Sequence, residues 1–128
     1  MPRQNHHDAV DLDRAFATFS EVFSPRRAAH VNDLVVKIAR IEGEFVWHRH
    51  EDTDELFLVH RGVMEIRYRD RAVVLEEGQL HVVPRGVEHA TFAERECLAM
   101  IIERAETVNT GDAEAGALTA DDEPFVTG

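Results

Sequence analysis

The hydrophobic positions near the N-terminus repeat with a helical period. Four large apolar side chains recur at intervals of four, three and four residues, namely Leu12, Phe16, Phe19 and Phe23. This spacing places them on one face of a helix, so we predict a helix over residues 11–23. Asp8 or Asp11 would cap its start, and Pro25 would end it. We expect the phenylalanine stripe to pack against the rest of the domain.

From residue 31 onward, the hydrophobic pattern changes to that of short β-strands. Runs rich in β-branched and aromatic residues alternate with turns that contain glycine, proline or acidic residues. The runs cover residues 34–41, 44–50, 55–60, 64–69, 72–75, 79–83, 90–93 and 97–103. Turn signals every eight to twelve residues indicate an antiparallel sandwich or small barrel. No helical pattern separates the runs, so a parallel βαβ architecture is not expected.

Length and cysteine content narrow the class of protein. The 128 residues correspond to one domain over 1–128, in which 44% of residues are hydrophobic. No apolar run is long enough to cross a membrane, and the first ten residues have no apolar segment typical of a secretory signal. Cys97 is the only cysteine, which excludes an intramolecular disulfide and a thiolate zinc cluster. We therefore expect a cytoplasmic protein in which Cys97 is buried.

The charge of the chain argues against two kinds of partner. A formal net charge of −11 disfavours binding to nucleic-acid backbones and to anionic membranes. No lysine or arginine follows Arg104, whereas the acidic residues continue, namely Glu106, Asp112, Glu114, Asp121, Asp122 and Glu123. We predict that residues 105–128 form a solvated, partly flexible acidic tail rather than a site.

The stretch HRHEDTDE, residues 48–55, carries the candidate chemistry. In a strand, residues two apart point to the same side, so His48 and His50 would direct their imidazoles into one space, together with Glu44. Glu55 begins the next strand, and a hairpin would bring its carboxylate opposite the pair. His89, which follows a glycine turn, would complete the set from a neighbouring strand. These ligands suit one divalent first-row metal: Fe, Mn, Ni, Cu, Co or Zn.

Two segments resemble the two motifs of the cupin family. They are GEFVWHRHEDTDELFLVHRG (residues 43–62) and GQLHVVPRGVEH (residues 78–89). The spacer after Gly43 is one residue shorter than the family pattern, and Ala93 stands where an asparagine is frequent. The wider sequence, including VNTGD at residues 108–112, is similar to small bacterial cupins labelled mannose-6-phosphate isomerase-like or uncharacterised.

The resemblance implies a fold and a ligand set. The fold would be all-β: a double-stranded β-helix, or cupin jelly-roll barrel, over residues 34–104 with a short N-terminal helix. The family's metal ligands fall on His48, His50, Glu55 and His89, the same residues that the strand geometry selects. Open sheet edges need cover, and small cupins commonly pair, so we expect a homodimer.

Three functional classes remain open. The first is a mononuclear metalloenzyme of the dioxygenase, isomerase or lyase type that acts on a small metabolite. The second is a cupin that binds a metal and a small ligand without turnover. The third has an adventitious metal and no chemistry. The sequence does not decide whether the protein is an enzyme, because this choice rests on fold analogy alone.

Two further residues are candidates for catalysis. Lys37 and Arg40 lie on opposite faces of the strand at 34–41, and we expect Lys37 to point inward because Arg40 is nearer the Gly43 turn. Glu44 is expected to face the metal. Lys37 would then hold a substrate carboxylate or enolate while Glu44 moves a proton, unless the two simply pair with each other. A small carboxylate or enol-type substrate is favoured over a sugar phosphate.

Three other histidines receive plainer interpretations. His60 falls on the strand face opposite Glu55 and should point outward. His30 should precede the first strand. His81 is left open between the cavity and the surface.

Overall fold

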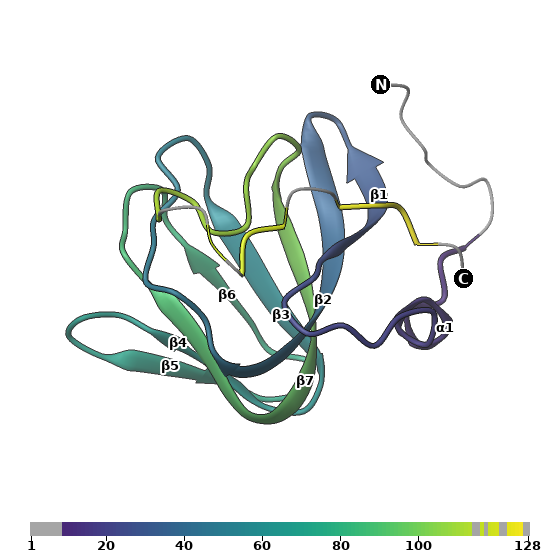
Figure 1. The fold of residues 1–128 in the computed structure, drawn as a ribbon, viewed down its shortest axis with the longest axis horizontal. Helices are drawn as coiled ribbons and strands as arrows, with labels where there is room; N and C mark the ends of the chain where they lie inside the picture. The colour runs from purple at the N-terminus through teal and green to yellow at the C-terminus, as the bar shows by residue number, and fades with distance from the viewer. Residues whose placement is uncertain (1–8, 114–115, 117, 121–122, 127–128) are drawn as a thin grey trace.

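The computed structural model describes residues 9–113, 116, 118–120 and 123–126. Within these residues the chain forms one short helix and seven strands, which Figure 1 shows as a barrel with the helix at one side. The elements are α1 (Leu12–Phe16), β1 (Arg26–Val31), β2 (Leu34–Glu44), β3 (Glu55–Arg61), β4 (Met64–Arg67), β5 (Ala72–Leu75), β6 (Leu80–Val83) and β7 (Ala90–Arg104).

All strand pairings are antiparallel, as the sequence predicts. The main path runs β1-β2-β7-β3-β6, and β4 pairs with both β5 and β7. The long strand β7 joins the two halves of the barrel, because its first residues pair with β4 and its last residues pair with β3. The all-β jelly-roll fold with a short N-terminal helix is therefore confirmed.

Three strand predictions need correction. The two runs at 90–93 and 97–103 form one continuous strand, β7. The predicted strand at 44–50 does not form: β2 ends at Glu44, and one isolated bridge joins His48 to His89. Residues 26–31 form the unpredicted strand β1, so His30 lies within the first strand and does not precede it.

The N-terminal helix is shorter than predicted. It covers Leu12–Phe16 rather than residues 11–23, and Asp11 caps it by accepting a hydrogen bond from Arg14 N at 2.9 Å. The alternative cap, Asp8, lies outside the described residues. The helix ends early because the Arg40 guanidinium takes the carbonyls that a longer helix would use, those of Phe16 (2.7 Å) and Phe19 (2.9 Å).

The phenylalanine stripe packs on the outside of the barrel, as predicted for two of its members. Phe16 and Phe19 are buried in a cluster with Ile38, whose side chain lies on the outer face of β2. Phe23 instead packs against the barrel interior. The interior contains the larger core, which consists of Ala39, Ile41, Phe57, Val59, Met64, Ile66, Leu75, Val83, Ala93, Cys97, Ala99 and Ile101. The predicted burial of Cys97 is confirmed.

The C-terminal segment is attached to the barrel where the structure describes it. Figure 1 shows it in yellow, crossing the strands toward β1. Arg27 of β1 donates to Pro124 O (2.8 Å) and accepts from Val126 N (2.9 Å), and Val126 is buried. The expectation of a solvated tail is therefore wrong for these residues.

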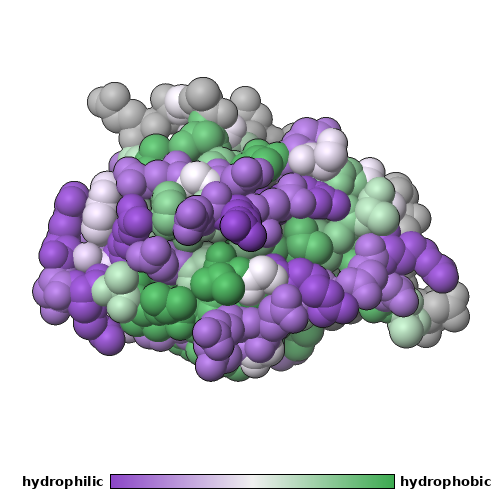
Figure 2. Space-filling model, turned by 90° about the horizontal axis from the view of Figure 1, so that it is seen from below, coloured by the Kyte–Doolittle hydropathy of each residue, from purple (hydrophilic) through white to green (hydrophobic). Residues whose placement is uncertain are grey.

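The molecular surface mixes polar and apolar side chains. Figure 2 shows one face, on which apolar patches lie between charged and polar residues. Among the described residues, no helix is long and apolar enough to span a membrane.

Candidate metal centre

Four buried side chains meet at one point inside the barrel: His48, His50, Glu55 and His89. One potential ligand atom from each lies within 4.8 Å of those of the other three. Glu55 is the first residue of β3, and His89 immediately precedes β7. His48 and His50 lie in the loop between β2 and β3. The structure thus brings together all four residues that the sequence predicts as ligands.

Backbone carbonyls orient two of the imidazoles. His48 Nδ1 donates to Val46 O at 2.9 Å, and His89 Nδ1 donates to Val87 O at 3.0 Å. These bonds fix the hydrogen on Nδ1 of a neutral ring and leave Nε2 as the lone-pair atom. His48 and His89 also exchange two backbone hydrogen bonds of 2.9 Å each, which hold the two ligand-bearing segments side by side.

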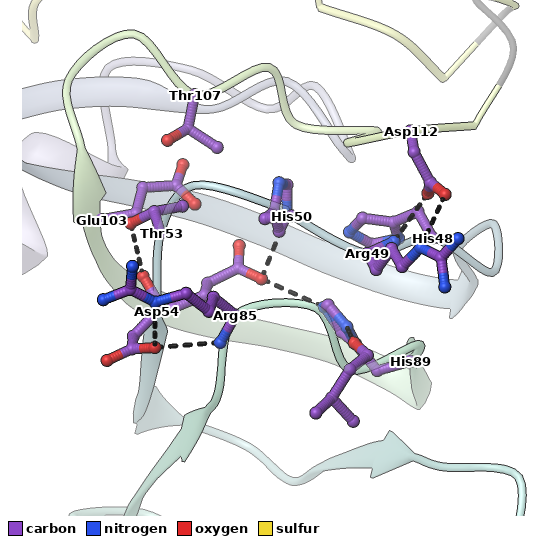
Figure 3. A network of polar contacts seen from close by, with 12 residues as sticks. His48, Arg49, His50, Thr53, Asp54, Arg85, His89, Glu103, Thr107 and Asp112 are labelled. Carbon is purple, nitrogen blue, oxygen red and sulfur yellow. Dashed lines mark hydrogen bonds and ion pairs between the residues drawn. The ribbon is translucent and has the colours of Figure 1, made fainter.

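Glu55 lies between two imidazoles, and Figure 3 shows its carboxylate facing them. Its Oε1 atom is 3.1 Å from His89 Nε2 and 3.4 Å from His50 Nε2. Burial alone would raise the pKa of Glu55, but the hydrogen bonds and charges of His50 and His89 outweigh it and lower that pKa well below its usual range. The carboxylate is therefore ionised.

His48 is held in its neutral form. Burial lowers the pKa of His48 to about 4, and the charge of His89 acts in the same direction. A neutral imidazole and an ionised carboxylate are the protonation states that metal ligation requires.

A narrow cavity of about 40 Å³ adjoins this cluster. His48 and Glu55 form part of its wall, and Lys37 and Glu103 add two more charged groups. The rest of the wall is mostly apolar, with Phe45, Phe57 and Ile101 among its residues, which is typical of a small-molecule pocket with few polar groups.

Lys37 points into this cavity, as predicted, and is fully buried. Its Nζ atom forms ion pairs with Glu103 (2.8 Å) and Glu123 (2.6 Å) and donates to Thr107 O (3.3 Å). Burial would lower the pKa of Lys37, but the two carboxylates outweigh it and raise that pKa. The lysine charge is thus already balanced inside the protein.

The predicted position of Glu44 is wrong. Its side chain is exposed and pairs with Arg67 at 3.1 Å on the outside of the barrel. The error arose from assuming regular alternation from residue 44 to residue 50. Phe45 lines the cavity, and His48 also points inward three residues later, so the chain between them is not a regular strand and the alternation is lost.

The comparisons with known proteins agree with this geometry. A family model, described as a cupin domain, matches residues 34–102. This chain belongs to the cupin family. The cupin is 36% identical to the uncharacterized protein YdbB of Bacillus subtilis (strain 168) over 83 residues, which cover 62% of this chain and 74% of that protein.

Solved structures show the same fold. The cupin resembles a cupin-2 domain containing protein from Shewanella frigidimarina with a TM-score of 0.73 and 44% identity, over 74% of this chain and 93% of that one. Protein NMB1881 from Neisseria meningitidis gives a TM-score of 0.70 at 23% identity, over 77% of this chain and 100% of that one.

Two charged residues of this cupin's cavity were missed in the sequence. Glu103 continues the inward alternation of Cys97, Ala99 and Ile101 along β7, so the pattern contained a signal for it. Burial and the neighbouring charge of Glu55 raise the pKa of Glu103 well above its usual range, against the opposing effect of Lys37. Glu123 had no such signal, because it lies in a segment without periodicity.

The remaining histidines of the cupin lie away from the ligand cluster. His60 points outward as predicted, stacks on Phe16 and contacts Asp13 at 2.7 Å. His81 lies opposite Phe57 on β6, and its Nε2 is 2.7 Å from the hydroxyl of Tyr68.

Proposed function

We propose that this cupin binds one divalent transition-metal ion, of the Fe, Mn, Ni, Zn, Co or Cu type, through His48, His50, Glu55 and His89. One observation carries the proposal: the cluster lacks a positive charge at its centre. His50 Nε2 is buried and has no hydrogen-bond partner within the described part of the chain. With the hydrogen of His89 on Nδ1, its Nε2 lone pair faces the Glu55 carboxylate at 3.1 Å.

Such an arrangement needs a cation between its acceptors. Three imidazole nitrogens and one carboxylate suit first-row divalent metals, and they leave one or two coordination positions for a small molecule. When bound, the ion would supply Lewis-acid or redox chemistry. The protein's own residues would orient the ligands, keep bulk water out through the apolar cavity wall and hold the second molecule.

We further propose a small-metabolite metalloenzyme of the dioxygenase, isomerase or lyase type. What supports turnover is that the cavity contains a carboxyl group outside the ligand set, Glu103, placed beside Glu55 and able to hold a proton. This group takes the place that Glu44 was expected to have. The alternative function is metal-dependent binding of a small ligand without turnover.

The charges of the cavity restrict the ligand. Lys37 is the single cation among the described residues that line it, and Glu103 and Glu123 already neutralise this charge. A sugar phosphate would bring two negative charges into a site with no free cation. We therefore propose a small carboxylate or enol-type ligand, whose carboxylate would replace Glu123 at Lys37.

The metal proposal predicts the behaviour of two variants. Metal content, measured on untagged protein by elemental analysis, should fall from about one ion per chain to near zero in His48→Ala and Glu55→Ala. Glu44→Ala is the matched control, because it removes a carboxylate outside the barrel. Circular dichroism should show the same fold in all four proteins. Full metal content in both ligand variants would contradict the proposal.

Catalysis needs a separate test. Metal-loaded wild type should be screened for oxygen uptake and for isomerase and lyase activity on small carboxylates. Saturable ligand binding without turnover in all three screens would favour the binding alternative.

A further inference from the structure

The residue between two of the proposed ligands is held by the C-terminal segment. Arg49 lies between His48 and His50, and both its backbone polar groups bond to Asp112. Arg49 N donates to Asp112 Oδ1 at 2.7 Å, and Asp112 N donates to Arg49 O at 3.0 Å. Figure 3 shows Asp112 reaching down from the C-terminal segment to this loop.

The approach of the two segments is close enough to require glycine. Gly111 has φ +55°, and a Cβ placed on it would lie 2.4 Å from Arg49 O and 2.9 Å from Cδ2 of the His48 ring. No real Cβ tolerates such contacts, so any side chain at 111 would push the ligand loop away. Gly111 N bonds to Val108 O at 2.9 Å, which closes the turn that presents Asp112.

The ligand loop depends on outside contacts for its shape because it is not a strand. His48 is tied to His89 by two backbone hydrogen bonds, and His50 O accepts from Gly86 N at 2.8 Å. Between these points the Arg49 peptide groups bond to Asp112. If Asp112 were removed, the peptide units on both sides of Arg49 could rotate, and they set the directions of the two imidazoles.

We propose that Asp112 is a positioning residue for the metal centre, with Gly111 permitting its approach. This inference rests on the proposed metal-binding function. Asp112 acts through the backbone of Arg49: it fixes the distance between the rings of His48 and His50, whose centroids are 4.8 Å apart. Metal sites require ligands to be held within fractions of an ångström, and loss of an outer partner of the ligands typically weakens metal affinity about 10–100-fold.

The alternative is that Asp112 contributes only its negative charge or only general stability. Its carboxylate also contacts Arg49 Nε at 3.3 Å. Glu51 contacts the same Nε atom at 2.8 Å. Glu51→Ala is therefore the matched control, because it removes a carboxylate from the Arg49 side chain and leaves the hydrogen bonds from Asp112 in place.

The test is a Co²⁺ titration, followed by the visible spectrum of the bound ion and by competition with a chelator. Asp112→Ala should bind Co²⁺ about 10–100-fold more weakly than wild type and should show a changed spectrum, because the ligand geometry changes. Asp112→Asn keeps an oxygen that accepts from Arg49 N, so it should stay within about threefold of wild type, as should Glu51→Ala. Should Asp112→Ala not fold, Asp112→Ser repeats the test with an oxygen that does not reach Arg49 N.

Three results would overturn the inference. Wild-type affinity and spectrum in Asp112→Ala would show that the loop holds its shape alone. An equal loss in Asp112→Asn would assign the effect to charge, and an equal loss in Glu51→Ala would assign it to the Arg49 side chain. A wild-type protein that binds no Co²⁺ would instead refute the proposed metal centre itself, so the two failures are distinguishable.

Discussion

At the scale of single residues, the least ordinary feature is the lysine inside the barrel. Lys37 is fully buried between Glu103 and Glu123, which are themselves buried. A buried charge is costly unless it is paired, and removal of one partner leaves the others uncompensated. Because the pKa of Glu103 is raised well above its usual range, Glu103 carries a proton, and Glu123 supplies the balancing charge.

Replacement of the lysine should therefore be costly. We predict that Lys37→Met lowers the free energy of unfolding by about 3–5 kcal/mol, because it strands the Glu123 carboxylate in the interior. Lys37→Met/Glu123→Gln should recover most of this loss, since it buries no charge. Both values would come from urea denaturation of the metal-free protein. A loss below about 1 kcal/mol in the single variant would indicate that Glu123 moves back to water.

At the scale of elements, the N-terminal helix depends on the barrel for its stability. A helix of five residues is not stable alone in water, so α1 must be held by packing. Phe16 provides the main contact: it is fully buried, stacks on His60 at 5.7 Å and belongs to the cluster that covers Ile38 of β2. Leu12, on the same helix, is only half-buried.

This contact predicts the effect of truncating either side chain. Phe16→Ala should lower the free energy of unfolding by about 3–5 kcal/mol, because it leaves a cavity on the outer face of β2. Leu12→Ala, the control in the same helix, should cost clearly less. Metal affinity should not change in either variant, since the ligands lie inside the barrel. Denaturation curves with a Co²⁺ titration would check both statements, and a loss of affinity in Phe16→Ala would contradict the second.

At the scale of the whole molecule, one sheet face is apolar beyond the part that α1 covers. In antiparallel sheets the solvent face usually carries polar residues, but here outward positions on three adjacent strands are all apolar. They are Leu56 and Leu58 on β3, Met100 and Ile102 on β7, and Leu80 and Val82 on β6. Leu80 is 56% exposed and Val82 is 41% exposed.

We propose that a second copy of the chain covers this face. The described part of β6 pairs only with β3, so its other edge is open to the same strand of a partner. The end of β6 carries charges of both signs, Arg85 and Asp54, which a two-fold interface can match to themselves. The net charge of −11 opposes association, so dimer formation should strengthen as salt screens it.

Light scattering at micromolar concentration should therefore give the mass of a dimer. Leu80→Lys should yield a monomer, because it places a charge at the centre of the apolar face. Val74→Lys is the matched control: Val74 is 55% exposed on β5, outside this face, and the variant should remain dimeric. A monomeric wild type at high salt, or equal behaviour of the two variants, would contradict the proposal.

The ligand set could be predicted from the sequence because its spacing is local. His48 and His50 are two apart, Glu55 opens the following strand, and the turn at Gly86 leads directly to His89. Strand alternation likewise predicted the antiparallel barrel and the inward direction of Lys37, since a period of two is a property of each strand by itself. These features depend on short-range geometry that neighbouring residues impose on one another.

Only the tertiary structure decided which charges share the cavity. Glu44 lies outside because the chain leaves the strand at Phe45, and no local pattern marks where a strand stops. Glu103 and Glu123 meet Lys37 from positions far along the chain, and Asp112 reaches Arg49 across 63 residues of sequence. Such contacts follow from how β7 and the C-terminal segment fold back over the barrel. Burial and pairing of charge are properties of the assembled fold, so the sequence alone could name the ligands but not the residues that hold them in place.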